Sequence, residues 1–211
     1  MAIIGNIGVS IPSDLYVSIR DGVYTISKRP DLVAETAVAI RKATMKLHMA
    51  DLWKTDLVEV FYTIGSNEGA QGSFRYTLDL TLSTKFKLYR RISSIRQYTA
   101  NQTGYELQLK ELDADRLLDD YNIEDINYWY QAGQQISIRA DRSLTQLKIV
   151  YFKYPNILPA EYDSWIARQF PDAVIEEAAA SVFKSIGKDS EAQRLAQAFN
   201  ENLAMLRITQ V

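Results

Sequence analysis

A dense group of carboxylates lies between residues 113 and 125 and is the first candidate for chemistry in this chain. Carboxylates that converge on one point bind hard cations, so a metal-dependent hydrolase is one hypothesis. The spacing fits no calcium loop, however, and a short helix here would spread the side chains around its surface. We therefore interpret the group as a solvated face; the alternative is an acidic patch that meets a basic patch on a neighbouring subunit. Its members are Asp113, Asp115, Asp119, Asp120, Glu124 and Asp125.

The only histidine of the chain, His48, is the second candidate, as a general base. A general base needs a positioned nucleophile or an orienting carboxylate, and no recognisable partner lies at a diagnostic spacing. Asp51 is one helical turn away, and we expect a local hydrogen bond between the two side chains. The chain has no cysteine, which excludes disulfides, thiolate catalysis and cysteine-ligated zinc. We expect a protein without enzymatic activity, metal or cofactor.

The segment GSNEGAQGS, residues 65–73, is rich in glycine but lacks the Gly-Lys-Ser/Thr ending of a phosphate-binding loop. We predict a hairpin tip instead. Its length, polarity and glycines suit a loop that becomes ordered when it meets a partner.

A basic stretch with interleaved aromatic residues covers residues 85–98. Basic and aromatic side chains on a sheet can hold and stack on single-stranded nucleic acid. The formal net charge of −2 gives no overall attraction to nucleic acid, and ordinary strand pairing accounts for the same pattern. A nucleic-acid-binding module on these strands is therefore the alternative function. The cations are Lys85, Lys87, Arg90, Arg91 and Arg96, and the rings belong to Phe86 and Tyr89.

The composition is that of a globular protein, since 211 residues with 47% hydrophobic content are ample for a core. The start, MAIIGNIGVSIPSDLY, lacks a basic leader. No later segment approaches the ~20 apolar residues that a membrane span needs. We expect a soluble protein made in the cytoplasm, with no membrane partner.

The helices and strands that position these residues are predicted from the spacing of apolar residues. A helix is predicted from Pro30 to about Ala50, where apolar residues recur at helical spacing. From Leu57 the period changes to two, which indicates half-buried antiparallel strands. Strands are predicted at 74–82, 86–98, 105–109, 127–131, 134–139 and 146–154, with a short helix at 114–121.

Two amphipathic helices close the chain. Pro171 opens the first and Gly187 ends it; the second begins at Asp189 or Ser190, and its apolar stripe fades after Leu206. Helices joined by so short a connection are expected to lie antiparallel.

An amphipathic helix near the start of the chain must bury its apolar face, and the two C-terminal helices are its natural partners. The sequence therefore predicts an α+β fold, a helical bundle of one N-terminal and two C-terminal helices with an inserted antiparallel β domain. The expected organisation is an N-terminal arm at 1–29, a bundle formed by 30–54 plus 160–211, and a β domain at 55–159.

Four stretches, taken in order, resemble the head-tail adaptor proteins of tailed bacteriophages, also called head completion or tail tubular protein A-like proteins. The likeness covers roughly Pro30 to Leu206 and is one of elements and spacings, without an invariant catalytic signature. Residues 1–29 lie outside it, and an arm that reaches a neighbouring subunit is one hypothesis for them. The stretches are AETAVAIRKATMKLHMADLWKTD, FRYTLDLTLSTKFKLYRRISSIRQY, NYWYQAGQQISIRADRSLTQLKIVYFKYP and LPAEYDSWIARQFPDAVIEEAAASVFKSIGKDSEA.

The resemblance implies a virion structural protein that assembles as a ring of about twelve copies under the portal, extends the DNA channel and provides the platform for tail attachment. The implied partners are the portal protein, tail or nozzle proteins, further copies of the chain, and passing genomic DNA without sequence specificity. The implied location is the neck between capsid and tail, with assembly in the host cytoplasm. The expected portal contacts, in a free C-terminal tail, are Arg207, Ile208, Thr209, Gln210 and Val211. The expected tail-facing loop carries Ser66, Asn67, Glu68 and Gln71.

Overall fold

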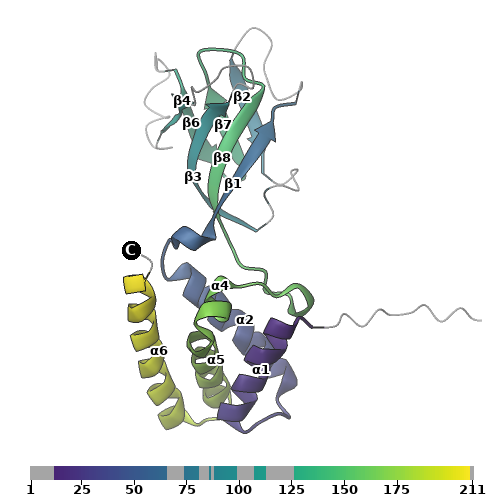
Figure 1. The fold of residues 1–211 in the computed structure, drawn as a ribbon, viewed down its shortest axis with the longest axis vertical. Coiled ribbons are helices and arrows are strands. Elements are labelled where there is room, and N and C mark those ends of the chain that lie inside the picture. The colour runs from purple at the N-terminus through teal and green to yellow at the C-terminus, as the bar shows by residue number, and fades with distance from the viewer. Residues whose placement is uncertain are drawn as a thin grey trace, which may run out of the picture. The chain divides into compact units, whose positions relative to one another are not determined.

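The protein divides into a helical unit and a strand unit. In the computed structural model, residues 12–65, 74–80, 86, 88–98, 107–112 and 126–209 are described. The helical unit is formed by Met1–Asp56 with Tyr154–Val211, and the strand unit by Leu57–Lys153. The chain thus leaves the helical unit once, forms the strands and returns (Figure 1). The α+β class predicted from the sequence is confirmed.

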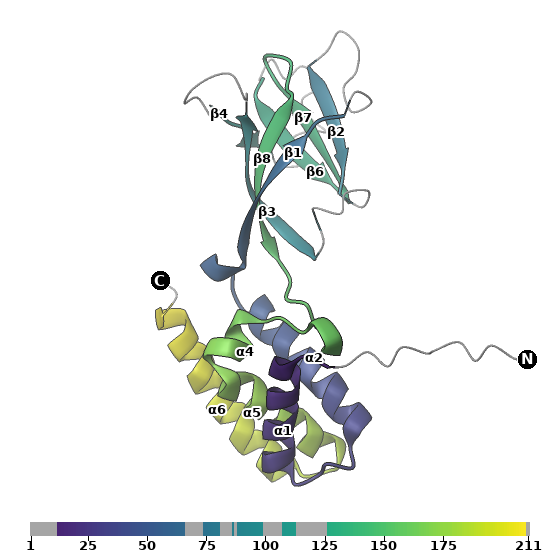
Figure 2. The same ribbon diagram turned by 45° about the vertical axis from the view of Figure 1, so that its right-hand side comes forward.

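Helix α5 is the centre of the helical unit, because it packs against α1, α2, α4 and α6 (Figure 2). Its alanines at 178–180 are buried, which allows the neighbouring helices to approach closely. The helices are α1 (Asp14–Ser27), α2 (Val33–Met49), α4 (Trp165–Gln169), α5 (Pro171–Ser185) and α6 (Asp189–Thr209), with short 3₁₀ helices η1 (Lys54–Asp56) and η3 (Pro159–Glu161). No described helix is long and apolar enough to cross a membrane.

The prediction of an N-terminal arm over 1–29 is wrong for most of that range, since Asp14–Ser27 forms α1 and packs on α5. The side chain of Ser13 caps this helix by accepting a hydrogen bond from the backbone N–H of Tyr16 at 3.3 Å. Tyr16, Ile19 and Val23 then bury one face of the helix in the core. The helical unit consequently has α1 and α4 in addition to the three helices that the sequence predicts.

Gly22 allows the close crossing of α1 and α5. A Cβ atom at Gly22 would lie 2.5 Å from Cδ1 and 3.1 Å from Cγ1 of Ile175 on α5. Both distances are too short for carbon atoms that are not bonded, so a side chain here would force the helices apart or push Ile175 out of place.

We expect Gly22→Val to lower the free energy of unfolding by about 1–3 kcal/mol, the usual cost of overpacking a core. Urea denaturation followed by circular dichroism at 222 nm measures this change. Thr25→Val is the matched control, because Thr25 is exposed on the same helix and its substitution is expected to change stability by about 0.5 kcal/mol or less. Equal losses for the two variants would contradict the role given to the α1–α5 crossing.

Two four-stranded sheets form the strand unit. The first, sheet A, has the order β1 (Leu57–Thr63), β8 (Gln146–Lys153), β3 (Tyr89–Tyr98) and β4 (Leu107–Gln108). The second, sheet B, has the order β2 (Arg75–Asp79), β7 (Gln135–Arg139), β6 (Tyr128–Ala132) and β5 (Lys110–Glu111).

Strand pairing in the unit is antiparallel except between β5 and β6, which run parallel. This pair is a departure from the predicted antiparallel domain. β5 follows β4 almost directly, after Leu109, so the chain passes from sheet A to sheet B between these two strands. The short helix predicted at 114–121 lies outside the described residues.

Both sheets contribute to one core, separate from the core of the helical unit. Alternate residues of β1, β2, β7 and β8 point into it, as the period of two predicts. Sheet A provides Ile95, Leu147 and Ile149, and sheet B provides Leu78, Ile136 and Ile138, among others. Gly133, at φ 61°, permits the tight turn between β6 and β7. The segment at 141–143 joins β7 to β8, which lie in different sheets, so it is a crossover and not a hairpin.

Candidate functional site

A buried hydrogen-bonded cluster surrounds His48 at the end of α2. Its Nδ1 atom lies 3.0 Å from both carboxylate oxygens of Asp56 in η1, and its Nε2 atom lies 2.9 Å from Oγ of Ser164. The indole N–H of Trp165 donates to Oδ1 of Asp56 at 2.8 Å. His48, Asp56 and Ser164 are each at most 2% exposed. The cluster thus joins the end of α2, η1 and the start of α4.

The serine, histidine and aspartate of this cluster are bonded in the order of a Ser-His-Asp triad, but their surroundings indicate a structural role. Ser164 is the N-cap of α4, and its Oγ atom accepts a hydrogen bond from the backbone N–H of Ala167 at 3.1 Å. A serine nucleophile must be approached by the substrate carbonyl, and the 2% exposure of Ser164 leaves no such approach. In this cluster the buried polar groups serve as hydrogen-bond partners for one another.

The partners of His48 are not apparent from the sequence, which indicates Asp51. In the structure the two imidazole nitrogens face Asp56 and Ser164. Ser164 is 116 residues away along the chain, so no local spacing could have indicated it.

Tyr162 adds a second buried polar contact to the same region. Its hydroxyl lies 2.6 Å from Oγ1 of Thr44 on α2, and its ring meets that of Tyr16 on α1 edge to face, at 5.7 Å between centroids. Burial raises the pKa of Tyr162 to about 12, so the hydroxyl stays protonated at neutral pH. Tyr162 therefore holds the first turn of α1 against α2.

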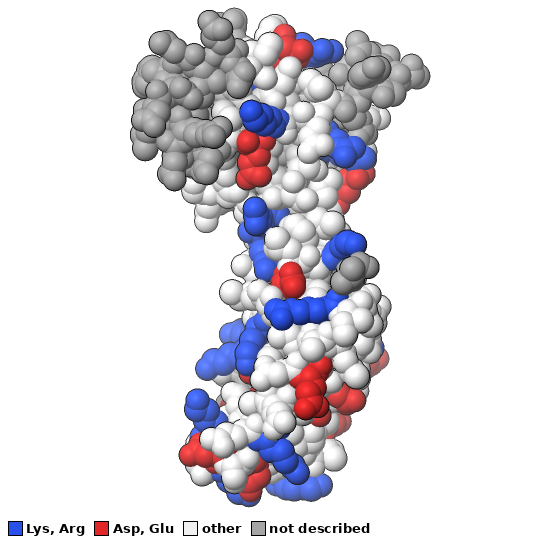
Figure 3. All heavy atoms as spheres, turned by 90° about the vertical axis from the view of Figure 1, so that its left-hand side faces the viewer, with Lys and Arg blue, Asp and Glu red and all other residues white. Residues whose placement is uncertain are grey.

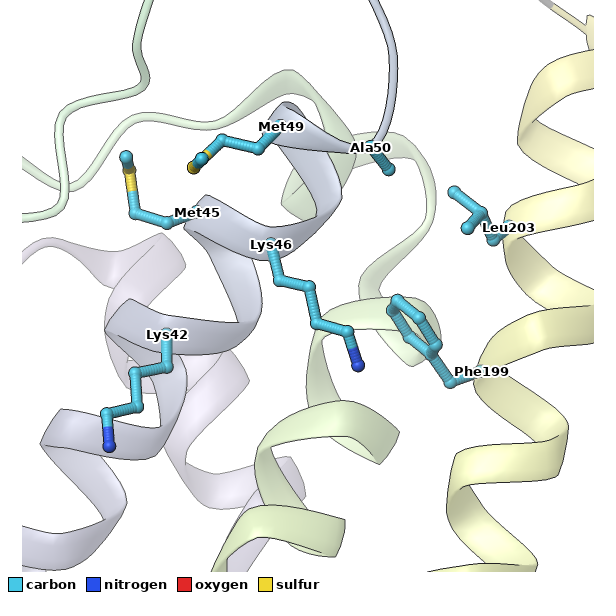
Figure 4. Close-up of a pocket in the computed structure, with 7 residues that line it drawn as sticks. All are labelled: Lys42, Met45, Lys46, Met49, Ala50, Phe199 and Leu203. Atoms are coloured by element: carbon cyan, nitrogen blue, oxygen red, sulfur yellow. The ribbon is translucent and has the colours of Figure 1, made fainter.

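An apolar groove of about 480 Å³ lies between α2 and α6 (Figure 4). Phe199 and Leu203 come from α6, and Met45 and Met49 from α2. The ammonium of Lys46 lies 4.2 Å from the centroid of the Phe199 ring, and its Nζ atom is 2.6 Å from Oε1 of Glu177. Lys42 and Ala50 complete the lining. Met49, Lys42 and Lys46 are exposed, whereas the Phe199 ring is 3% exposed, so another molecule has access to the α2 side of the groove.

Further exposed apolar side chains lie near the C-terminal ends of α2 and α6, and those of α6 stand on the side of the helix that is turned away from Phe199 and Leu203. We call them the apolar end; they are Met49, Met205 and Ile208, which are 57%, 63% and 76% exposed. Arg207 connects the two helix ends, because its guanidinium donates to the carbonyl of Ala50 at 3.4 Å and lies 3.5 Å from the carboxylate of Asp51.

The prediction of a free tail at 207–211 is wrong, because α6 continues into this segment. Arg207, Ile208 and Thr209 are the last residues of this helix, and Gln210 and Val211 lie outside the described residues. The helix continues because Leu206 is fully buried and anchors its last turn.

Two of the predicted sites fall in parts of the chain that the structure does not describe. The tail-facing loop residues Ser66, Asn67, Glu68 and Gln71 lie there, and so does the acidic group at 113–125. Within the described residues, no group of three or more His, Asp or Glu side chains is placed to hold a metal ion.

The aromatic part of the basic stretch at 85–98 faces the core of the strand unit. Phe86 is 4% exposed, and its ring centroid lies 5.6 Å from that of Tyr151. Tyr89 packs on the same core, at 6.1 Å from Tyr151. The pattern that predicted a stacking platform is therefore explained by core packing for these two rings.

Comparisons with known proteins give no match for this chain, either among protein-family models or among curated proteins.

Proposed function

We propose that this chain is a structural assembly protein, the head-tail adaptor of a tailed bacteriophage, which forms a ring under the portal, extends the DNA channel and carries the tail. The order of elements in the sequence supports the family. The observation that carries the assembly role is the exposed apolar surface of the helical unit, which comprises the apolar end, Met49, Met205 and Ile208, and the α2–α6 groove.

Exposed apolar surface of this kind favours a protein partner. Methionine side chains are flexible and polarisable, so they adapt to the shape of a partner surface. Over the helical unit, the face shown in Figure 3 intermixes acidic and basic side chains and has no large area of one sign. A partner therefore meets apolar contacts with mixed charges around them, as at the core and rim of a protein interface.

The buried cluster around His48 fits a non-enzymatic role. Its serine, imidazole and carboxylate are used to tie α2, η1 and α4 together, and none of the three reaches the surface. A rigid helical unit suits a ring subunit, because it offers a preorganised surface and lowers the entropy lost on assembly.

The test is portal binding, measured by the mass of the protein alone and after mixing with the portal protein of the phage that encodes it. We expect the double variant Met205→Asp, Ile208→Asp to weaken portal binding at least ~10-fold, since burial of one such side chain contributes about 1.5–3 kcal/mol. Both side chains are exposed, so the variant is expected to fold.

Val33→Asp is the matched control for this experiment. Val33 is an equally exposed apolar residue at the opposite end of α2, where an acidic side chain is favourable to the helix. We expect its portal binding to equal that of the parent protein. The proposal fails if the folded parent protein does not associate with the portal, and the role of the apolar end fails if the double variant binds unchanged.

A further inference from the structure

The described methionine side chains are concentrated at one end of the helical unit. Three of the four methionines in the chain lie near the C-terminal ends of α2 and α6. Met45 and Met49 are one helical turn apart and share a face of α2, as Figure 4 shows. Met49 and Met205 are 57% and 63% exposed, whereas Met45 is half-buried. The fourth, Met1, lies outside the described residues.

Met49 and Met205 are the most exposed sulfur-containing side chains in the described part of the chain. The chain has no cysteine, so no thiolate competes for an oxidant. Of its tryptophans, Trp53 and Trp129 are buried and Trp165 is half-buried. A thioether reacts without first losing a proton, so the exposure of its sulfur atom sets the rate. We therefore expect an oxidant to react with Met49 and Met205 before the other side chains that the structure describes.

Hydrogen peroxide is a sufficient oxidant for this reaction, and no further co-reactant is needed. One peroxide molecule transfers one oxygen atom to the sulfur: the O–O bond breaks, an S=O bond forms, and the other oxygen leaves as water with both protons. The sulfur is oxidised by two electrons, and the peroxide is reduced by two. The product, methionine sulfoxide, is polar and chiral, and methionine sulfoxide reductases reverse the change.

Oxidation changes two of the three side chains of the apolar end, Met49 and Met205, and leaves Ile208 apolar. Water satisfies the sulfoxide oxygen, which accepts hydrogen bonds, so a partner that covers it without a donor loses binding free energy. Both methionines are exposed, and the fully buried Leu206 still anchors the last turn of α6. The helical unit is therefore expected to stay folded while the character of its surface changes.

We propose that Met49 and Met205 form an oxidation-sensitive modification site, and that their conversion to sulfoxides by peroxide weakens the binding of a protein partner at the apolar end. Interfaces that contain methionine are disrupted in this way, because a flexible apolar contact is replaced by a polar group. The inference rests on the proposed function for the identity of the partner, and it adds the regulation of the same surface.

The test begins with the free, full-length protein, treated with hydrogen peroxide and then with catalase. Mass spectrometry of its peptides locates the added oxygen atoms, and we expect Met49 and Met205 to be oxidised faster than Met45. Retention on a hydrophobic-interaction column is expected to fall as they react, while circular dichroism at 222 nm stays unchanged. Portal binding is expected to become at least ~10-fold weaker, since two side chains lose their apolar contacts. Reduction by methionine sulfoxide reductases for both epimers is expected to restore it.

The double variant Met49→Leu, Met205→Leu is the matched control. Leucine is similar in size and apolar, but it has no sulfur to oxidise. We expect this variant to bind the portal as the parent does, and to keep its column retention and portal binding after peroxide treatment. Met45→Leu is the second control, and its response to peroxide is expected to equal that of the parent protein. The inference is overturned if Met45 is oxidised as fast as Met49 and Met205, or if peroxide weakens the double variant as much as the parent.

Failure of this inference can be told from failure of the proposed function. If the untreated, folded parent protein does not bind the portal, the adaptor role is refuted, and the peptide masses and column retention still decide the oxidation site. Unchanged retention after oxidation of Met49 and Met205 would refute the inference in either case. Portal binding that survives their complete oxidation would also refute it and leave the adaptor role intact.

Discussion

Replacement of Asp56 by leucine is expected to lower the free energy of unfolding of the helical unit by about 2–5 kcal/mol. Asp56 accepts hydrogen bonds from the indole N–H of Trp165 and faces the imidazole of His48 with both carboxylate oxygens. Leucine fills a similar volume but accepts no hydrogen bond, so the imidazole of His48 and the indole N–H of Trp165 both lose this acceptor. The measurement is urea denaturation followed at 222 nm, where the helices dominate the signal.

Two further variants isolate the cause of this loss. Asp56→Asn keeps one acceptor oxygen and is expected to lose less stability than Asp56→Leu. Asp51→Leu removes a nearby carboxylate that is half-exposed and 3.5 Å from Arg207, a kind of ion pair that contributes at most about 1 kcal/mol. If Asp56→Leu were no more damaging than Asp51→Leu, the buried cluster would not be what ties η1 to α2 and α4.

The helices that the sequence predicts are those with strong local signals. Helix α5 begins at Pro171, as predicted, and α6 follows a turn at Gly187, whose φ of 74° few other residues adopt. Helix α2 ends at Met49, close to the expected Ala50. Start and stop signals of this kind act through neighbouring backbone groups, so they are readable without knowledge of the fold.

The sequence contains a helix signal for α1, although an arm is predicted over these residues. Ser13 precedes a stripe of Tyr16, Ile19 and Val23 at helical spacing, with Asp14 in the first turn. The reason for its burial, the absence of a side chain at Gly22 opposite Ile175, is visible only once α5 is in place.

The alternation of residues within a strand can be predicted from the sequence, but the pairing of strands cannot. Alternation correctly identifies inward residues such as Leu78 and Ile149, because the pleat depends on the strand alone. It does not reveal which strands are neighbours: β1 pairs with β8, more than eighty residues later, and the chain changes sheets between β7 and β8. Such pairings bring together residues that are far apart along the chain, so the sequence could not predict which side chains share a face.

The same limit applies to the surfaces proposed for assembly. The sequence shows that the apolar stripe of α6 fades after Leu206, but only the fold places Met49 of α2 and Ile208 of α6 at the same end of the helical unit. A function that depends on surfaces, unlike one that depends on a catalytic motif, is therefore spread over residues distant in sequence.

Phe199→Ala is expected to lower the free energy of unfolding by about 3–5 kcal/mol, the range found when a buried phenylalanine is truncated. The Phe199 ring is 3% exposed, belongs to the helical core and also lines the α2–α6 groove. Truncation would leave a cavity between α2 and α6 and remove the support of the groove. Urea denaturation at 222 nm measures the loss of stability.

Lys46→Met separates two contributions to the free energy of unfolding, that of the packed Phe199 ring and that of the cation above it. Methionine keeps an apolar stem over the ring but removes the ammonium at 4.2 Å from its centroid and the ion pair with Glu177. Because the Lys46 side chain is 53% exposed, solvent weakens both interactions, and we expect a loss of about 1 kcal/mol or less. A loss as large as that of Phe199→Ala would mean that the cation, and not the packing of the ring, holds α6 against α2. The small loss that we expect would instead show that the packing of the Phe199 ring contributes more to the stability of the helical unit than the cation above it does.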